Sequence, residues 1–373
     1  MIGIIQVSPA PYREKTFILC NEKMNNGVEV ATFPDGMDTH PEWEYKSLKE
    51  DYIGAPPKSY VIFGRTMVFN SDVKSWIRSK KWDALLIEGY NSFTNIYVLL
   101  YAFIHHIPVI LGLDSVENPG HKFIKARLYK KVSAFWVPGN RSRDYLISEG
   151  VPKDKIFLGK YTYDLLEIKK KIDSIDKRSI QRRLNIKNTD IVFLFVGKLI
   201  PSRNVNLLLK AFSNIENDNV KLIIIGDGPD EYLVKDCPDN RLIHIPKVPL
   251  SELYDYYSVA DVYVHPGAEP YSLAVVQAVA TDSIVVSSSS VGAIDDVLIE
   301  GQNGYTFEYG DYDGLYERLQ NVLNNYSELK ASACKQGELI RNNKSVEFSS
   351  EQLFKAMDYV LNSKNKAGII NGR

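Results

Sequence analysis

Cysteine is scarce in this sequence. Only Cys20, Cys237 and Cys334 occur among 373 residues, far apart and without a Cys-x-x-Cys pair. A sparse, odd number argues against a disulfide framework and favours reduced structural thiols in a cytoplasmic protein. The six histidines show no metal-binding spacing such as His-x-x-x-His, and no Asp-x-Asp follows a suitable strand. The sequence therefore predicts no metal site.

Long hydrophobic runs are also missing. The longest apolar stretch, residues 95–104, is interrupted by tyrosine and is too short to span a bilayer. The N-terminus lacks the basic and long apolar regions of a signal peptide, and residues 1–7 are typical of a buried first strand. We expect a cytoplasmic protein, either free or peripheral at the inner membrane surface.

Charge of one sign does not dominate. The 45 basic and 46 acidic residues leave a formal net charge of -1, which provides no global field to attract nucleic acid. No Gly-x-Gly-x-x-Gly follows the first strand, which argues against a nicotinamide-dependent oxidoreductase. A Walker loop and a nucleophile elbow are absent as well. Nucleic-acid binding and several common enzyme classes are thus disfavoured.

An alternation of short apolar strands with helical segments is present along the whole chain. The length predicts two domains, and 45% hydrophobic with 24% charged residues is a globular composition. Alternating strands and helices predict parallel sheets with crossover helices. The expected strands are residues 3–7, 28–32, 84–88, 108–112, 134–137, 191–196, 222–225, 241–245, 261–264 and 284–287. We expect an α/β fold of two Rossmann-like domains that face across a cleft, with ligands beyond the carboxyl ends of the strands.

The domain boundaries follow from changes in composition. The prediction is an N-terminal domain over residues 1–163, a charged linker over 164–186 and a C-terminal domain over 187–345. The linker is dense in Lys, Arg and Asp, as a solvated helix face is. Residues 346–362 are expected to form a helix that packs back on the N-terminal domain, and residues 363–373 a loose tail.

Three segments of the C-terminal half carry chemistry. Gly197 and Lys198 end a strand, and Arg203 opens the next helix, so two cations can converge on a diphosphate. A Gly-Asp-Gly-Pro turn at residues 226–229 either contacts a ligand or only shapes the floor of the site. In the third segment Glu269 precedes a helix that begins near Ser272, where backbone amides are free to bind phosphate.

In this ordered set of motifs the chain resembles the large retaining glycosyltransferase family 4, which has the GT-B fold. The resemblance covers essentially all of the second domain. It includes Gly197-Lys198-Leu199, Gly226-Asp227-Gly228-Pro229, Ala260 to Pro266, the family's Glu-x7-Glu region from Glu269, Gly292 with Asp296, and Gly301-Gln302-Asn303-Gly304.

The resemblance implies a role for each matching residue. Lys198 and Arg203 would stabilise the departing diphosphate, and Glu269 would contact the donor sugar as the third catalytic residue. Donor-binding residues would be Gly197, Gly226, Asp227, Gly228, Tyr271, Ser272, Leu273 and Gln277. The enzyme would need no cofactor or metal, because cationic side chains of the protein would take the place of a metal ion at the diphosphate of the nucleotide sugar substrate.

The chain departs from the family pattern at several of these positions. Gln277 stands where the family has the second Glu, which binds the ribose hydroxyls, so the charge-assisted acceptor pair is lost. Lys198 replaces the usual Arg, and Arg203 the usual Lys. Asn204 and Ser272 stand where Gly is common.

The first domain matches the family more loosely, as the acceptor side of such an enzyme. Its predicted acceptor-side residues are Arg13, Glu88, Tyr90 and Asp114, all in loops at strand ends, and the His that many members carry near Leu113 is missing. The alternative interpretation is that Asp114 caps the segment that follows it and that Arg13 is a solvated loop residue. The basic amphipathic segment His121–Lys131 either rests on an anionic membrane or is a covering helix with solvated lysines.

The expected function is retaining transfer of a sugar from a nucleotide sugar to a glycan, lipid-linked or small-molecule acceptor, for example in polysaccharide biosynthesis. Two alternatives remain open. A sugar-nucleotide epimerase or hydrolase on the same fold would need no acceptor. A non-catalytic nucleotide-sugar-binding partner subunit is suggested by Gln277 and by the missing His.

Overall fold

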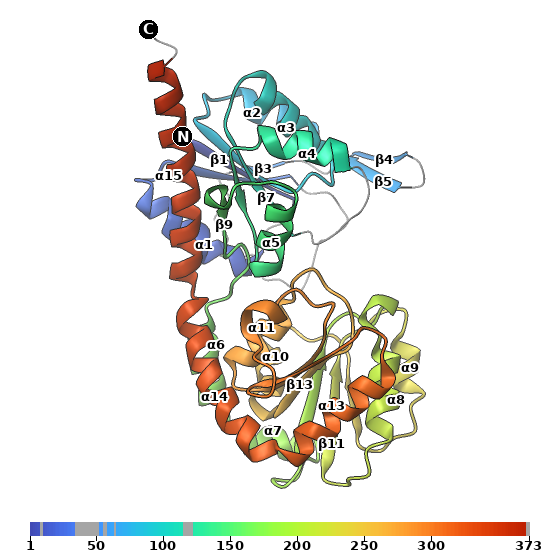
Figure 1. The fold of residues 1–373 in the computed structure, drawn as a ribbon. Coiled ribbons are helices and arrows are strands. Elements are labelled where there is room, and N and C mark those ends of the chain that lie inside the picture. Colours follow the sequence, from blue (N-terminus) through green and yellow to red (C-terminus); the bar gives the residue numbers. More distant parts are fainter. Residues whose placement is uncertain (8–9, 34–51, 55–57, 63–64, 115–121, 371–373) are drawn as a thin grey trace. The chain divides into compact units, whose positions relative to one another are not determined.

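The computed structural model describes residues 1–7, 10–33, 52–54, 58–62, 65–114 and 122–370 (Figure 1). These residues form two compact units. Unit 1 comprises Met1–Tyr163 with Val346–Arg373, and unit 2 comprises Asp164–Ser345. The residues proposed as a charged linker, 164–186, contain two helices and belong to unit 2, and the final helix belongs to unit 1.

Unit 1 is built on a parallel seven-stranded sheet in the order β3-β2-β1-β6-β7-β8-β9. A separate antiparallel hairpin, β4–β5, precedes α2. The strands are β1 Ile2–Gln6, β2 Val28–Thr32, β3 Tyr52–Ile53, β4 Lys58–Ile62, β5 Arg65–Phe69, β6 Ala84–Glu88, β7 Val109–Gly112, β8 Ala134–Trp136 and β9 Ile156–Phe157. The helices are α1 Pro11–Lys23, α2 Val73–Arg78, α3 Phe93–Ile104, α4 Lys122–Lys131, α5 Asn140–Ser148, the short 3-10 helix η1 Lys153–Lys155, and α15 Val346–Ile370.

Unit 2 is built on a parallel six-stranded sheet in the order β12-β11-β10-β13-β14-β15. Its strands are β10 Ile191–Val196, β11 Val220–Ile225, β12 Leu242–Ile245, β13 Val262–His265, β14 Ile284–Ser288 and β15 Gly304–Phe307. Its helices are α6 Leu165–Ser174, α7 Lys177–Arg183, the 3-10 helix η2 Pro201–Arg203, α8 Val205–Ser213, α9 Glu231–Lys235, α10 Leu250–Val259, α11 Leu273–Ala280, α12 Ile294–Val297, α13 Tyr312–Asn324 and α14 Tyr326–Asn343.

All ten predicted strands are present, with ends that differ by at most two residues. The sequence did not predict β3, β9, β15 or the hairpin β4–β5. Strands β3 and β9 are only two residues long and give no periodic signal. The final helix begins at Val346, as predicted, and runs to Ile370, so the tail expected to be loose beyond Asn362 is helical up to Ile370.

The sheet of unit 1 is buried on both faces because successive side chains of each strand point to opposite sides. Ile2 and Ile4 of β1 pack in one cluster with α1 and α15, whereas Ile5 packs in the other cluster with α2 and α3. Continuous apolar strands of this kind are typical of parallel sheets covered by helices on both faces.

Helix α15 lies beside α1 and closes one face of this sheet (Figure 1). Leu353 and Met357 are fully buried there, and the Sγ atom of Cys20 lies 3.6 Å from the Sδ atom of Met357. Burial raises the pKa of the Cys20 thiol to about 12, so it stays protonated. The last helix of the chain therefore completes the core of the first unit.

We predict that Leu353→Ala lowers the free energy of unfolding of unit 1 by about 2–5 kcal/mol, because it leaves a cavity under α15. All four tryptophans of the chain lie in unit 1, so urea unfolding followed by tryptophan fluorescence reports on this unit. Leu100→Ala, at a position on α3 that is 54% exposed, is the matched control and should change stability by less than about 0.5 kcal/mol. Equal stability of the two variants would contradict a structural role for α15.

Candidate active site

The strand order of unit 2 reverses between β10 and β13. From β10 the chain proceeds outward through β11 and β12, and then returns to the other side of β10 with β13 and β14. Ligands of open parallel sheets bind beyond the carboxyl ends of the strands at such a reversal. The segments that follow β10 and β13 hold the predicted residues Lys198, Arg203 and Glu269.

Close backbone contacts hold these segments together. A Cβ atom on Gly226 would lie 1.9 Å from the carbonyl oxygen of Gly197, and one on Gly267 would lie 2.5 Å from the Cα atom of Arg203. Gly226 also has a φ of 148°, which L side chains rarely adopt. The backbone amide of Ala268 donates to the carbonyl oxygen of Ser202. Glycine at both positions therefore allows the strand-end segments to lie directly against one another.

Arg203, Glu269 and His265 form one connected network. The Nη2 atom of Arg203 lies 2.9 Å from Oε1 of Glu269, and the Nε2 atom of His265 lies 3.1 Å from Oε2. Arg203 also donates to the carbonyl oxygen of Ala268. Burial opposes ionisation of Glu269, but the hydrogen bond with His265 and the charge of Arg203 outweigh it and lower the pKa of this carboxyl group. Glu269 is thus an ionised carboxylate fixed by two partners.

His265 is a functional candidate that the sequence interpretation did not single out. It is the last residue of β13, its side chain is only 2% exposed, and its Nδ1 atom has no hydrogen-bond partner among the described residues. The sequence signal that could have identified His265 is its position four residues before Glu269.

Lys198 and Asp227 are exposed at the ends of β10 and β11. Lys198 makes no ion pair within the described ranges, so its charge is not neutralised as that of Arg203 is. The carbonyl oxygen of Asp227 accepts a 2.7 Å hydrogen bond from the amide of Leu199, and a Cβ atom on Gly228 would lie 2.3 Å from the carbonyl oxygen of Leu199. The Gly-Asp-Gly turn therefore supports the backbone beside Lys198.

Helix α11 begins at Leu273 directly after the loop that carries Glu269. Ser272 caps it, with its hydroxyl accepting from the amide of Val275, and adopts a φ of 92°. Asn204, the cap of α8, likewise has a positive φ of 51°. These are the two positions at which the sequence replaces a common glycine, so the departures fall where the backbone conformation favours glycine.

Tyr271 and Gln277 are both buried next to this helix start. Burial and a hydrogen bond with Asp296 raise the pKa of Tyr271 far above its usual value, so its phenol is protonated. Gln277 is 4% exposed, and its Nε2 atom has no hydrogen-bond partner in the described part of the chain. An amide donor buried without a partner costs about 1–3 kcal/mol, which a ligand acceptor would recover.

Unit 1 repeats the reversal of strand order, between β1 and β6. Arg13 lies in the first turn of α1, after β1, and Glu88 ends β6, and their side chains form an ion pair that is about 5% exposed. Arg13 is therefore not a solvated loop residue. Tyr90, two residues beyond Glu88, places its hydroxyl 3.5 Å from that of Tyr129.

Asp114 belongs to a second polar cluster at the same edge of the sheet. Lys160 and the hydroxyl of Tyr161 both donate to its carboxylate. Burial opposes ionisation, but these two donors and the charge of Arg13 lower the pKa of Asp114. Sequence reasoning missed Lys160, a buried amine, because it missed β9, the strand that places residues 158–161 at this edge.

The basic segment His121–Lys131 forms α4 from Lys122, and His121 lies outside the described residues. Lys130 and Lys131 are exposed, whereas Tyr129 is buried. In the part of the chain that the structure describes, no three His, Cys, Asp or Glu side chains come together as metal ligands would. Among the same residues no helix combines the length and hydrophobicity needed to cross a bilayer.

Comparisons with known proteins agree with this arrangement. Residues 176–343 match the family described as "Glycosyl transferases group 1". The chain is 25% identical over 197 residues to the capsular polysaccharide biosynthesis glycosyltransferase CapM of Staphylococcus aureus, covering 51% of this chain and 50% of that protein. It is 26% identical over 293 residues to the sulfoquinovosyl transferase SQD2 of Arabidopsis thaliana, covering 75% of this chain and 51% of that protein. The chain thus spans about half the length of these relatives.

Solved structures establish the fold. Anabaena HepE in complex with UDP-glucose superposes with a TM-score of 0.72 at 16% identity, covering 96% of this chain and 99% of that one. This likeness and the two parallel sheets confirm the predicted GT-B class with two Rossmann-like domains.

We predict that Ser272→Gly is more stable than Ser272→Ala by about 1–3 kcal/mol. Both variants lose the capping hydroxyl, but only glycine releases the strain of a Cβ atom at a φ of 92°. Thermal unfolding followed by circular dichroism measures the difference. An alanine variant as stable as the glycine variant would refute strain at this position.

Proposed function

We propose, from the premise that residues 176–343 match the group 1 glycosyl transferases, that this chain transfers a sugar from a nucleotide-diphosphate donor to an acceptor with retention of configuration. The acceptor is a glycan, a lipid-linked molecule or a small molecule. The observation that carries the proposal is the Arg203–Glu269–His265 network at the reversal of strand order in unit 2. A cation and an ionised carboxylate there suit a diphosphate and a sugar hydroxyl.

In this proposal the diphosphate binds near Lys198 and Arg203. Lys198 is exposed and makes no ion pair within the described ranges, so it offers a full charge to the phosphates. Arg203 is already paired with Glu269 and can divide its five donors between that carboxylate and a phosphate oxygen. Glu269, oriented by His265, accepts hydrogen bonds from the sugar, and amides at Ser272 and Leu273 add to the attraction for phosphate.

The transfer step breaks the bond between the anomeric carbon and the β-phosphate oxygen. The acceptor oxygen forms the new bond on the same face, and its proton passes to the leaving phosphate. The electron pair of the broken bond remains on the diphosphate, where Lys198 and Arg203 stabilise the developing charge. No additional protein base is required in this scheme.

Unit 1 would bind the acceptor through polar groups at the carboxyl edge of its sheet. Arg13 with Glu88 provides a buried ion pair at that edge, and the buried amine of Lys160 pairs with the partly exposed carboxylate of Asp114. Tyr90 and Tyr161 add hydroxyl groups beside them. Side chains held this way recognise a hydroxylated acceptor with little loss of conformational entropy on binding.

We expect Lys198→Ala and Arg203→Ala each to lower turnover by about 10²–10³-fold, because each removes a cation that stabilises the leaving group. Release of the nucleoside diphosphate from a panel of nucleotide sugars with cell-derived acceptors measures the effect. Lys210→Ala, which removes an exposed lysine of α8 in the same unit, is the matched control and should retain full turnover.

Normal turnover in both variants would refute the proposal. Incubation with donor alone distinguishes the alternatives. Conversion or hydrolysis of the donor without an acceptor would indicate an epimerase or a hydrolase, and donor binding without any turnover would indicate a binding subunit.

We further predict that Gln277→Glu tightens donor binding by about tenfold, because a carboxylate forms stronger hydrogen bonds with ribose hydroxyls than an amide does. The same change should lower the stability of the free protein by about 1–3 kcal/mol, since the position is only 4% exposed. Ligand-observed NMR titration and thermal unfolding measure the two effects. Gln277→Met has a similar length and no hydrogen-bonding amide, and it should weaken donor binding. If both variants bind the donor as the wild type does, Gln277 does not contact it.

A further inference from the structure

Helix α3 of unit 1 is hydrophobic on two sides. It contains no charged residue over its twelve positions, Phe93–Ile104. One side packs into the core through residues such as Val98, Leu99 and Ala102. On another side Leu100 is 54% exposed and Ile104 is 71% exposed. A helix that is apolar all round is normally buried all round, so this exposed side calls for a partner.

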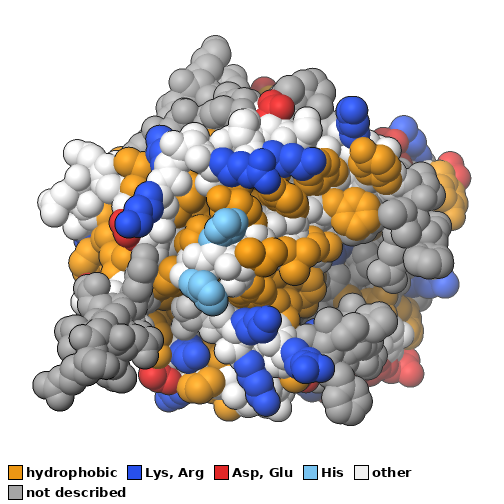
Figure 2. Space-filling model, turned by 90° about the horizontal axis from the view of Figure 1, so that it is seen from above, with side chains coloured by type: hydrophobic (Ala, Val, Ile, Leu, Met, Phe, Trp, Pro, Cys, Tyr) orange, Lys and Arg blue, Asp and Glu red, His pale blue; other side chains and the backbone are white. Residues whose placement is uncertain are grey.

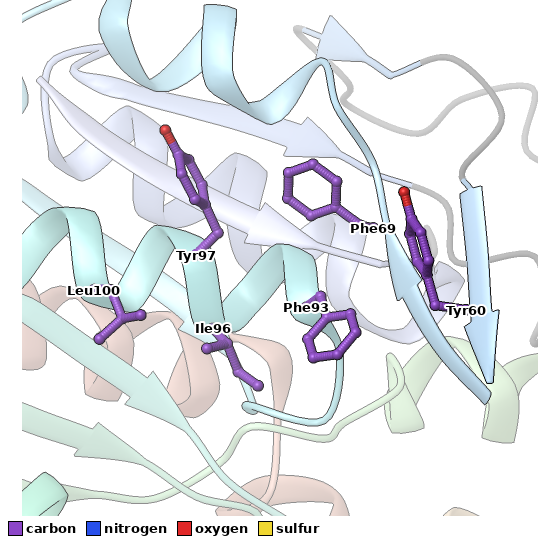
Figure 3. A pocket seen from close by; sticks show the side chains of 6 residues that line it. All are labelled: Tyr60, Phe69, Phe93, Ile96, Tyr97 and Leu100. Carbon is purple, nitrogen blue, oxygen red and sulfur yellow. The ribbon is translucent and has the colours of Figure 1, made fainter. Parts of the chain in front are cut away.

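An open apolar pocket of about 350 Å³ lies between this side of α3 and the hairpin β4–β5 (Figure 3). Its walls are Tyr60, Phe69, Phe93, Ile96, Tyr97 and Leu100. The rings of Tyr60 and Phe93 pack edge to face with their centroids 6.5 Å apart, and the rings of Phe69 and Tyr97 do so with their centroids 5.9 Å apart. Aromatic and branched aliphatic walls of this kind suit a hydrocarbon chain and offer very few polar groups to a polar ligand.

Cations flank the apolar surface. Helices α2, α3 and α4 together carry seven Lys or Arg residues, two in α2 and five in α4, and no Asp or Glu. The Nζ atom of Lys74 lies 5.2 Å from the ring centroid of Phe69. The Nζ atom of Lys131 lies 5.5 Å from the ring centroid of Phe103. Seen from above, the molecule shows hydrophobic side chains in the middle of the face, with Lys and Arg beside them and few acidic groups (Figure 2).

We propose that this face of unit 1, formed by α3, the hairpin β4–β5 and the lysines of α2 and α4, docks on an anionic lipid bilayer, with a hydrocarbon chain in the pocket. The chain as a whole has a formal net charge of -1, so the excess of cations is a property of this face. Apolar and aromatic groups that enter a lipid layer between lysines that reach the headgroups are the features of an interfacial membrane site. Membrane contact is one of two interpretations of the basic segment His121–Lys131, and the proposed site adds to it an apolar surface on a different helix.

The charge pattern favours a bilayer over the other occupants. Nucleic acid would match the cations but leave the apolar pocket unused. A second copy of this chain would bring Lys74 and Lys131 to the interface a second time, and like charges would oppose each other. The inference does not depend on the transferase chemistry. Together with the proposed function, it favours an acceptor carried on a lipid.

Co-sedimentation of the full chain with lipid vesicles tests the proposal. Binding is expected to vesicles that contain phosphatidylglycerol and to be weaker to phosphatidylcholine alone. The double variant Leu100→Ser with Ile104→Ser should lose about tenfold or more of the binding to anionic vesicles, since both exposed apolar groups are replaced. Lys130→Gln with Lys131→Gln should reduce the same binding by about tenfold and have little effect on neutral vesicles.

Leu339→Ser is the matched control, because Leu339 is 49% exposed on α14 of unit 2 and lies outside the proposed face. It should bind vesicles as the wild type does. Absence of vesicle binding, or equal binding by the Leu100/Ile104 variant, would overturn the proposal. A dimer in sedimentation velocity that this variant dissociates, without vesicle binding, would assign the face to a second copy. Donor binding measured on the same samples separates failure of this proposal from failure of the proposed function.

Discussion

The reversal of strand order in a parallel sheet is the constraint on which both candidate sites depend. All strands of such a sheet end at one edge, and on either side of the reversal the connecting helices lie on opposite faces, so two loops diverge and leave the edge accessible. Unit 1 places Arg13 and Glu88 at this point, and unit 2 places Arg203 and Glu269 there. The two units thus carry the same kind of ion pair at the equivalent place in two different sheets.

Glycine and a polar cap shape this edge in unit 2. Gly226 and Gly267 bring neighbouring loops into backbone contact, which no residue with a Cβ atom would allow without a shift. Ser272 caps α11 with its hydroxyl at a φ of 92°, so the hydrogen bond of the cap is accompanied by backbone strain. Strained residues cluster at functional sites, where the surrounding structure holds them in place. Here the strained residue lies three positions after Glu269.

Much of the fold could be predicted from the sequence, because parallel strands in a buried sheet are continuous apolar runs. Ile191–Val196 is such a run, and its register next to β11 and β13 places Lys198 at the edge. Strand β9 has two residues and no pattern, so Lys160 and its bond to Asp114 could not be anticipated. Pairing of Arg203 with Glu269 joins side chains 66 positions apart, which local sequence does not encode. Local sequence likewise gives no sign that the Nε2 atom of Gln277 lacks a hydrogen-bond partner among the described residues.

The Arg203–Glu269 pair would limit how the proposed donor enters the site. A carboxylate that is 28% exposed loses part of its hydration, and removal of its cation would leave that cost uncompensated. A diphosphate that attracts Arg203 therefore competes with Glu269 for the same guanidinium group. His265 would reduce this conflict, because its Nε2 atom holds one oxygen of Glu269 by a hydrogen bond that does not involve Arg203. In the proposed enzyme, the histidine at the end of β13 would keep Glu269 in place when a diphosphate draws on the guanidinium group of Arg203.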